Sequence, residues 1–512
     1  MKDYYINNSQ EFNELHIIYK VILFLFFIFV LLFKSNNTLF QTKIEVIPEI
    51  SEYKNQTLKL FIPSNKYCYL FPKTIFFHSK FRNDNETNNI QIETINLNEN
   101  NKSYFATYIM ETRRNFYNYY ELLNNNGLIR SIHEGHSHNL FINALTMRNF
   151  HRFKDIAIIN KFQKKYSFLN TVEFYHKDIL YKNYIAMKKI FNDDYNYMSE
   201  TYCYPEDQNQ IYIKFNNYSL DINNLWLVKP VARSVGAGIH FFTSLKEEMN
   251  NGRLFLITKF ISNLDLIDNK KYDLRLYVLL SGLKPLRIYL YKKGLVRRAS
   301  STFNITKEEI QDKYMFLTNT GINQKNEKYI FPHEYNDSKA NIWNLDTYKN
   351  YLKSKNVDYD VIFEKIKDIT IKSVISFQKK LSSQNKDIDD RNVYTLLGID
   401  ILITDKFEPI LLEINNKPNL SINNLIDEPI KTNLFADMLN IVGISLFSRK
   451  EKYQRLNKKK TIEESVNNAL CELNRPRGDF DLIFPLEKNI EKYKKFFIDN
   501  NQENILFWKK IC

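Results

Sequence analysis

Two short apolar runs, GIDILIT (398–404) and PILLEIN (409–415), decide the fold of this chain. Each run carries one carboxylate among Ile and Leu residues, and the four residues between them are compatible with a turn, so a β-hairpin is predicted. The hairpin would begin with Thr404 facing Pro409. Asp400 then lies directly opposite Glu413, on the same face as Asn415, because alternate residues of a strand point to the same side.

Two carboxylates on an apolar face repel each other and are costly to remove from water unless a cation lies between them. The all-oxygen set of Asp400, Glu413 and Asn415 suits Mg²⁺, which usually keeps water and substrate phosphates as its other ligands. The sequence therefore predicts a Mg²⁺ site on this hairpin. The alternative, an exposed edge hairpin with solvated charges, is disfavoured by the uniformly apolar flanks.

The composition indicates a folded protein with an acidic partner. The chain has 512 residues, of which 44% are hydrophobic, and this length allows two or three domains with a substantial core. A net charge of +14 favours nucleic acid, an anionic membrane or an acidic polypeptide tail, although a bias toward lysine codons would give the same value. Nucleic acid is the weakest of these, because the aromatic residues do not interleave with the basic clusters as a base-stacking surface requires.

Cysteine and histidine give little sign of a metal centre. The cysteines are far apart and form no CxxC pair, which predicts free thiols in a reducing compartment and no zinc site; they are Cys68, Cys203, Cys471 and Cys512. Three histidines in a short Gly-containing stretch, His133, His136 and His138, could hold a metal. A loop surface is the simpler interpretation of that stretch.

Residues 17–33 are a candidate membrane anchor. The run from Val21 to Phe33 is unbroken and apolar, with Lys20 before it and Lys34 after it. A bilayer-spanning helix needs about 20 apolar residues, so the segment suffices only if Lys20 extends its amino group to the interface. A buried amphipathic helix is the alternative, and lysines on both sides leave the orientation open.

A glycine-containing loop follows the first strand of the β-rich centre of the chain. Lys229 ends the apolar run LVK and is followed by Ser234, Gly236 and Gly238. Such a loop can place backbone N–H groups against phosphate oxygens while the lysine supplies charge. It is not a Walker A loop, because no Gly-Lys-Ser/Thr follows, and a Gly-x-Gly turn alone is a weak signal. Further on, Lys271, Asp273 and Arg275 alternate along one strand and form a polar ridge.

Seven segments that follow one another along the chain resemble the tubulin tyrosine ligase-like family of ATP-grasp amino-acid ligases. They are WLVKPVARSVGAGI, LITKFI, KKYDLRLYVLL, PLRIYLYKKGLVR, FLTN, LLGIDILI and ILLEINNKP, and the resemblance covers residues 156–483. The phrases VKPVARS and GDFDLIFP look most like the glutamate-adding members associated with cilia and flagella. The resemblance implies an α+β, ATP-grasp fold preceded by a small α/β N-subdomain and by the N-terminal hydrophobic segment.

Composition and the resemblance together suggest a division of the chain. Residues 1–150 form an N-terminal region that includes the apolar segment 17–33 and, because of its Asn and Glu content, a low-complexity loop at 83–102. The ligase subdomains then follow at 151–224 (N-terminal), 225–300 (central ATP-grasp) and 301–446 (C-terminal ATP-grasp, with the Mg²⁺ site). Residues 447–512 are expected to form a basic C-terminal tail.

Most of the site residues are implied by this resemblance rather than by spacing. Arg275, Arg297, Thr318 and Asn319 would form the catalytic set around the γ-phosphate and the acyl intermediate. The nucleotide would be bound by Lys177, Lys229, Ser234, Gly236, Gly238, Thr258, Lys259, Phe260, Ile261, Lys271 and Asp273, with Thr258 where the family usually has Gln. Asp400, Glu413 and Asn415 match the family's Mg²⁺ ligands and agree with the hairpin argument.

The resemblance implies an ATP-dependent ligase that adds glutamate to the acidic tails of tubulin, with two Mg²⁺ ions. It would act in the cytoplasm, on the cytoskeleton, at microtubules, cilia, flagella or basal bodies, and the N-terminal segment could add membrane contact. The alternatives are a non-catalytic microtubule-binding member of the fold, or a ligase that adds glycine, tyrosine or another amino acid to tubulin or a different acceptor. Five features depart from the family pattern: Val235, Ala237, Phe316, Gln324 and the stretch 416–419, where small residues are common.

Overall fold

The computed structural model describes residues 56–512 except 64–65, 71–72, 83–90, 98–103, 106, 112–116, 131–139, 144–162, 167, 169–170, 172–174, 232–235, 251–253, 307, 386–390, 449–460 and 499–500. The candidate membrane anchor at 17–33 and the three histidines at 133–138 lie outside these residues. No helix within the described part is both long and apolar enough to cross a membrane.

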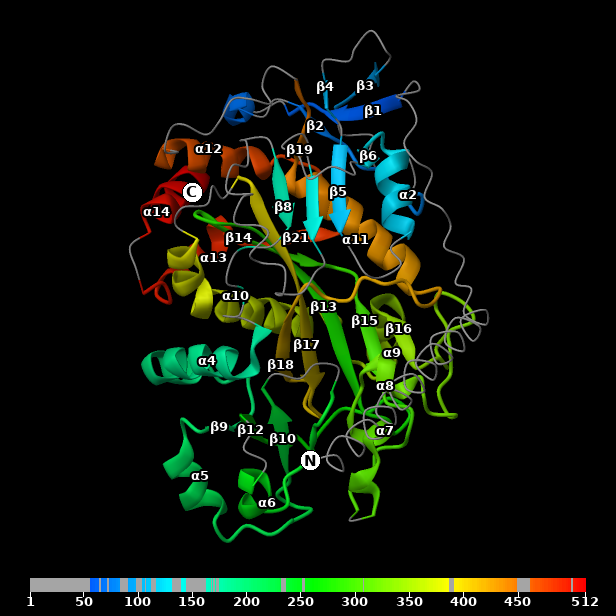
Figure 1. Cartoon of the computed structure of the whole chain (residues 1–512), viewed down its shortest axis with the longest axis vertical. Helices are drawn as coiled ribbons and strands as arrows, with labels where there is room; N and C mark the ends of the chain where they lie inside the picture. Colours follow the sequence, from blue (N-terminus) through cyan, green and yellow to red (C-terminus); the bar gives the residue numbers. More distant parts are fainter. Residues whose placement is uncertain are drawn as a thin grey trace, which may run out of the picture. The chain divides into compact units, whose positions relative to one another are not determined.

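A large mixed sheet of eleven strands forms the centre of the described chain (Figure 1). Its middle is the antiparallel pair β13 (Tyr272–Leu283) and β17 (Val393–Ile403), and β18 (Pro409–Asn416) continues from β17 as the predicted hairpin. The other strands are β5 (Thr107–Glu111), β6 (Ile129–Arg130), β7 (Leu140–Asn143), β8 (Lys164–Tyr166), β14 (Leu286–Tyr291), β15 (Leu295–Arg298), β16 (Ile342–Asn344) and β21 (Phe480–Phe484). The predicted α+β class is confirmed.

The sheet is covered by helices on both faces because its strands are apolar on both sides. Along β13, Leu276 and Val278 pack in the core that includes α10 (Tyr359–Gln384), and Tyr277 and Leu279 pack in the core that includes α11 (Asp427–Val442). Asp400 lies on the α11 face, since it is an even number of residues from Tyr394 and Leu396, the β17 residues of that core. The predicted site therefore opens on the α11 side of the sheet.

Capping residues set the starts of several helices. The Asp358 side chain accepts a hydrogen bond from a backbone N–H in the first turn of α10, and Asn344 does the same for α9 (Leu345–Ser354). Thr461 and Glu464 form a capping box at α12 (Ile462–Glu472). The other helices are α2 (Tyr117–Asn125), α4 (Lys177–Phe191), α5 (Gln208–Phe215), α6 (Leu245–Asn250), α7 (Lys313–Phe316), α8 (Thr320–Asn323), α13 (Glu487–Lys494) and α14 (Gln502–Ile511). Short 3₁₀ turns are η2 (Lys66–Leu70), η6 (Asn192–Asp194) and η7 (Glu309–Gln311).

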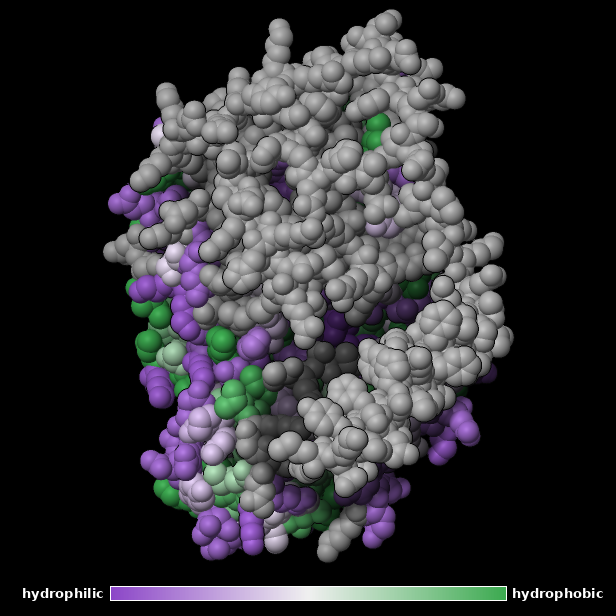
Figure 2. Space-filling view, viewed as in Figure 1, coloured by the Kyte–Doolittle hydropathy of each residue, from purple (hydrophilic) through white to green (hydrophobic). Residues whose placement is uncertain are grey.

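A second, four-stranded sheet carries the predicted phosphate loop. Its order is β11 (His240–Phe241), β10 (Trp226–Pro230), β12 (Phe255–Lys259) and β9 (Thr201–Tyr204), and residues of α5 and α6 pack against it. The strands of segment 225–300 thus divide between two sheets, because β13 to β15 belong to the large one. In Figure 2 the coloured residues at the lower end of the view are a mixture of hydrophilic and hydrophobic ones, as on a surface that faces water.

The low-complexity loop predicted at 83–102 is partly wrong. Within it, β3 (Ile92–Leu97) pairs with β1 (Gln56–Phe61) in a small sheet that also contains β2 (Thr74–Ile75) and β19 (Ile444–Ser445). The Asn and Glu content suggested a loop, but the stretch IETINL is rich in β-branched residues and an edge strand tolerates polar residues on its open side. A separate pair joins β4 (Tyr104–Phe105) to β20 (Phe447–Ser448).

The basic C-terminal tail predicted for 447–512 is also wrong where the structure describes it. From Thr461 onward the chain forms α12, β21, α13 and α14, and β21 pairs with β14 of the large sheet. The lysine count concealed the apolar faces of these elements, such as Val466 and Leu470 on α12. The prediction of free thiols fails for Cys68 and Cys471, which form a disulfide between η2 and α12. Their separation of 403 residues hid the contact.

The hairpin has the predicted pairing of its acids but a different start. Pro409 faces Ile403, not Thr404, and a bulge in β18 between the partners of Asp400 and Ile401 shifts the register by one residue. Asp400 therefore lies opposite Glu413 after all. The bulge places the Glu413 carboxylate on the face that the sequence predicted for it.

Candidate functional site

Two arginines from neighbouring strands bind the central carboxylate. On β13, Arg275 pairs in register with Asp400 of β17, and its Nε and Nη2 donate to the two carboxylate oxygens at 2.5 and 2.9 Å. Arg297 of β15 places Nη2 2.9 Å from Asp400 Oδ2. Burial alone would raise the pKa of Asp400, but the two guanidinium charges hold it well below its usual range. Asp400 is thus ionised and fixed in place.

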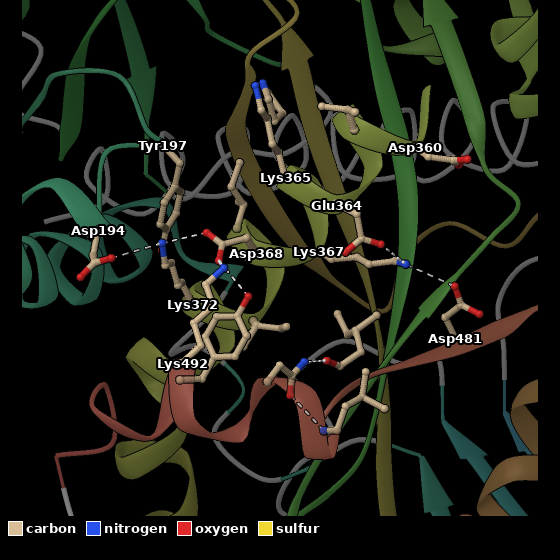
Figure 3. A pocket seen from close by; sticks show the side chains of 18 of the residues that line it. Asp194, Tyr197, Asp360, Glu364, Lys365, Lys367, Asp368, Lys372, Asp481 and Lys492 are labelled. Carbon is tan, nitrogen blue, oxygen red and sulfur yellow. Dashed lines mark hydrogen bonds and ion pairs between the residues drawn. The ribbon is translucent and has the colours of Figure 1, made fainter. Parts of the chain in front are cut away.

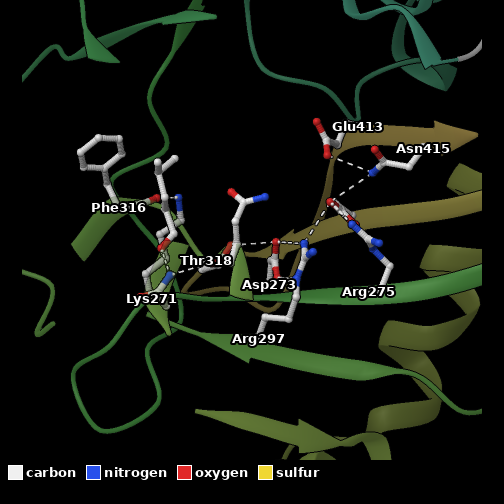
Figure 4. A network of polar contacts seen from close by, with 12 residues as sticks. Lys271, Asp273, Arg275, Arg297, Phe316, Thr318, Glu413 and Asn415 are labelled. Carbon is white, nitrogen blue, oxygen red and sulfur yellow. Dashed lines mark hydrogen bonds and ion pairs between the residues drawn. The ribbon is translucent and has the colours of Figure 1, made fainter. Parts of the chain in front are cut away.

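Arg297 extends the network to a second acid. Asp273 pairs with it across β13 and β15, and accepts hydrogen bonds from Nε at 2.8 Å and Nη2 at 2.5 Å. Thr318 donates its hydroxyl to Asp273 Oδ2 at 2.9 Å, so the FLTN segment joins the same network (Figure 4). The polar ridge predicted along β13 is therefore buried and paired rather than solvated.

The hairpin adds a third acid with a different environment. Asn415 Nδ2 donates to Glu413 Oε1 at 2.9 Å and approaches Asp400 Oδ2 at 3.4 Å. Burial and then the charge of Asp400 raise the pKa of Glu413 above its ordinary value. No arginine or lysine within the described residues forms an ion pair with Glu413, in contrast to Asp400. Glu413 is therefore not held by an ion pair, and the charges of Lys177 and Lys229 act on it only over a longer distance.

The donor set fits Mg²⁺. Glu413 and Asp400 offer carboxylate oxygens on one face, and turning the Asn415 amide would exchange its donor for its carbonyl oxygen. A small number of oxygen ligands, completed by water and phosphate, is the usual protein environment of this ion. A cation here would also relieve the repulsion that raises the pKa of Glu413. The three predicted ligands therefore have the donor atoms that Mg²⁺ prefers.

Lysines line the side of the site that faces the four-stranded sheet. Burial lowers the pKa of Lys229 to about 8, with Glu413 opposing this shift and Lys177 adding to it, so these three side chains lie near one another. Burial also lowers the pKa of Lys271 to about 8, and Lys229 contributes to the shift. Lys271 donates to the backbone carbonyl of Phe316 at 2.8 Å. Buried cations of this kind suit phosphate oxygens.

The predicted glycine loop lies against the FLTN segment. Gly236 and Gly238 have φ of 72° and 76°, a left-handed backbone that favours glycine. A Cβ on Gly236 would lie 2.9 Å from Asn319 Oδ1, so only glycine allows this approach. Asn319 is therefore placed beside the loop, whereas Ser234 lies outside the described residues.

Four consecutive residues predicted to bind the nucleotide, Thr258 to Ile261, differ in their surroundings. Thr258 is buried and accepts a hydrogen bond from Thr201 at 3.2 Å, and Phe260 is buried beneath the Lys271 amino group, 5.4 Å from it. Lys259 is exposed, so its side chain is turned to solvent, and Ile261 is half-buried. Of this group, Phe260 is the residue that the structure connects to the lysines of the site.

A separate groove of about 1110 Å³ lies over α10, on the opposite face of the sheet (Figure 3). It is lined by many charged residues, but they bind each other. Lys372 is 2.7 Å from Asp368, Lys367 is 2.8 Å from Glu364 and 3.5 Å from Asp481, and Lys365 contacts Glu408. Such a surface has little unpaired charge to offer a ligand.

A profile of the Tubulin-tyrosine ligase family matches residues 156–453, more than half of the chain. The chain belongs to this family. It is 31% identical over 291 residues to the tubulin monoglutamylase TTLL4 of Mus musculus, covering 56% of this chain and 24% of the relative. It is also 31% identical over 293 residues to the mouse tubulin polyglutamylase TTLL5 (56% and 22%) and 29% identical over 368 residues to the mouse tubulin polyglutamylase TTLL6 (67% and 44%). The chain thus spans less than half the length of these relatives.

Two lysines beside the site of this tubulin-tyrosine ligase family member escaped the sequence reasoning. Lys431 of α11 is buried, lies 2.7 Å from Asp427 and has its pKa lowered first by burial and further by Arg275 and Arg297. Lys417 follows β18 directly. A signal for Lys417 was present, since it continues the alternation of Glu413 and Asn415; Lys431 sits in a helix whose approach to the sheet has no sequence signature.

Proposed function

We propose that this chain is an ATP- and Mg²⁺-dependent ligase that attaches glutamate to side-chain carboxylates of tubulin. The proposal is supported by the family membership together with the intact acid–arginine network of Asp400, Arg275 and Arg297. A member of the fold that had lost catalysis would have no need to retain buried charges that are costly to desolvate. The names of the similar proteins, tubulin monoglutamylase and tubulin polyglutamylase, favour glutamate over glycine or tyrosine.

The reaction forms an amide in two steps. A carboxylate oxygen of the acceptor attacks the γ-phosphorus of ATP, the bond to the bridging oxygen breaks, and ADP leaves behind an acyl phosphate. The amine nitrogen of glutamate then attacks the acyl carbon, and phosphate leaves with the bonding electrons while the amine loses a proton. Such transfers depend on positioning and on charge neutralisation rather than on a protein nucleophile.

The residues of this chain divide these tasks. Lys229 and Lys271, with the Gly236–Gly238 loop, are placed to bind the phosphates. Arg275 and Arg297, fixed by their carboxylates, hold positive charge where the transferred phosphoryl group gains negative charge. Asp400, Glu413 and Asn415 would hold Mg²⁺, which supplies further neutralisation of the phosphates when bound. Asn319 and Thr318 face the same loop and network.

The positive net charge of the chain supports an acidic protein partner. A net charge of +14 attracts the acidic tails of tubulin, and this attraction is weakened by salt. We place the activity on microtubules, in the cytoplasm and in cilia or basal bodies.

The decisive experiment is incubation of the purified full chain with tubulin, ATP, Mg²⁺ and one amino acid at a time. Mass spectrometry of tail peptides should show glutamate additions, with none from glycine or tyrosine. Omission of ATP should abolish the product. Protein that binds ATP and tubulin but yields no mass addition with any amino acid would overturn the proposal.

A further inference from the structure

Lys417 is a half-buried cation at the edge of the site that the network described above does not use. It follows the last residue of β18, two positions after Asn415. Within the described part of the chain its amino group forms no ion pair or hydrogen bond, and it lies over the Tyr166 ring, 6.0 Å from the ring centre. A half-buried lysine without an anion is costly unless a ligand supplies one.

The strand arrangement places Lys417 on the face of the Mg²⁺ ligands. β13 lies along one edge of β17, while β18 and β8 follow one another along the other edge. Tyr166 of β8 pairs with Tyr394, whose side chain shares a face of β17 with Asp400. Since Lys417 lies over the Tyr166 ring, it stands on that same face.

Lys417 lies at the end of β18 that is remote from the predicted nucleotide-binding sheet. The turn of the hairpin contacts the chain just after β12, where Leu264 bridges to Thr404 and Asn263 accepts from the backbone of Asp405. The other end of the hairpin lies toward β8, since Asn416 pairs with Leu397 and β8 pairs with Val393 and Tyr394 of the same strand. The phosphates are assigned to Lys229 and Lys271 near β10 and β13, so the anion at Lys417 is a different group.

The neighbouring lysine of β8 lies on the other side of the sheet. Lys165 pairs in register with Val393, whose side chain packs in the core on the α10 face, so the Lys165 side chain starts from that face. An anion on the α11 face would therefore be bound by Lys417 itself.

The backbone around Lys417 is fixed by several contacts, so the point from which its side chain extends is set before any substrate arrives. Lys417 itself has φ of 53°, and the next residue, Pro418, packs so closely on Gly398 that a Cβ there would be 2.9 Å away. The following loop is fixed by two hydrogen bonds: Tyr119 donates to the carbonyl of Leu420 at 2.6 Å, and Lys431 donates to that of Ser421 at 2.8 Å. A pre-positioned charge binds with little further loss of conformational freedom.

We propose that Lys417 binds a carboxylate group of the substrate next to the reacting centre. The carboxylate belongs either to the incoming amino acid or to a residue of the acidic acceptor tail; both present the same chemistry. The inference rests on the proposed ligase function and deepens it. Lys417 acts here as a specificity-determining residue for an anionic substrate, not as a group that takes part in bond making.

The test compares Lys417→Asn with Lys417→Arg in the full chain. Asparagine tolerates the left-handed backbone of this position, and arginine keeps the charge. We expect Lys417→Asn to raise KM about tenfold for one substrate, the usual size of one lost charged hydrogen bond, with kcat and the KM for ATP unchanged. Lys417→Arg should recover most of the loss. A raised KM for glutamate assigns the carboxylate to the amino acid, and a raised KM for a Glu-rich tail peptide assigns it to the acceptor.

A binding measurement separates this inference from the ligase proposal. The affinities of the wild-type chain and Lys417→Asn for glutamate and for a fluorescent Glu-rich peptide are measured without ATP, with Lys406→Asn, in the exposed hairpin turn, as the matched control. Weaker binding by Lys417→Asn alone supports the inference even if no product forms. Equal affinities of all three proteins for both ligands would overturn it, whatever the outcome of the mass measurement.

Discussion

The predicted site on the α11 face and the groove over α10 both contain lysines, but the two sets of lysines differ in their partners. In the groove, Lys365, Lys367 and Lys372 each contact a carboxylate. In the predicted site, Lys229 and Lys417 form no ion pair with a carboxylate of the described residues, and burial lowers the pKa of each to about 8. Charge that is neutralised within the protein shapes the surface, whereas charge left without a partner at the cost of desolvation is available for a ligand.

The acids of the predicted site also differ in whether they form ion pairs. Asp400 and Asp273 are neutralised by arginines, and the pKa of Asp400 falls. Glu413 is not neutralised, and its pKa rises. We therefore infer that Asp400 and Asp273 position the arginines, and that Asp400 also faces the metal site. Glu413 is the carboxylate that a bound cation would stabilise most.

The largest effect is expected from Glu413→Gln. The substitution keeps the shape but removes the charge that would bind Mg²⁺, so amide formation should fall at least about a hundredfold, as for loss of one important electrostatic group in an active site. The rate is measured by mass spectrometry of tail peptides. Glu408→Gln, on the turn of the same hairpin and paired with Lys365, is the matched control and should leave the rate unchanged. Equal rates for the two variants would remove the metal assignment.

A smaller effect is expected from Lys229→Met. Loss of one charged contact to phosphate should weaken ATP binding by about 2 kcal/mol, or roughly thirtyfold, since hydrogen bonds to charged groups contribute about 1.5–3 kcal/mol. Isothermal titration calorimetry measures it, and Lys365→Met in the groove should bind ATP as the wild type does. If Lys229→Met bound ATP as tightly as the wild type, the absence of an ion pair at Lys229 would not indicate a phosphate-binding role.

The pH dependence of ATP binding tests whether the lysines of the predicted site bind phosphate. Lys229 and Lys271 have pKa values lowered to about 8, so each loses its charge as the pH rises through 8, and a bound phosphate favours the charged form. ATP binding should therefore take up protons near pH 8 and weaken between pH 7 and 9. Calorimetry in buffers of different ionisation enthalpy counts the protons. Proton uptake that is identical in wild type and Lys229→Met would contradict this assignment for Lys229.

Local patterns predicted those parts of the site that depend on one strand or one turn. The hairpin, its opposed acids and the ridge of Lys271, Asp273 and Arg275 all follow from a period of two and from apolar flanks. The starting pair of the hairpin was wrong because a bulge has no clear signature in an Ile- and Leu-rich run. The bulge left the functional pairing intact.

Contacts between distant segments could not be predicted from the sequence. The position of Arg297 beside Asp400, the Cys68–Cys471 disulfide and the brace from Tyr119 to Leu420 each join residues that are far apart along the chain. The folded C-terminal segment was hidden by its lysines, since composition reports solvated faces more strongly than the narrow apolar face that packs. The family resemblance supplied Arg297 but not Lys417, where this chain differs from the common pattern.

The smallest effect is expected in the groove itself. Lys367→Met removes ion pairs with Glu364 and Asp481, but the lysine side chain is 21% exposed and both acids are more exposed still, so solvent screens the interaction. The free energy of unfolding, measured by urea denaturation, should change by at most about 1 kcal/mol, and amide formation and ATP affinity should not change. Lys365→Met should behave in the same way, because its partner Glu408 is also exposed. If instead either substitution lowered the rate of amide formation without lowering stability, the groove would be part of the substrate path, and paired charge would no longer distinguish a structural surface from a binding one.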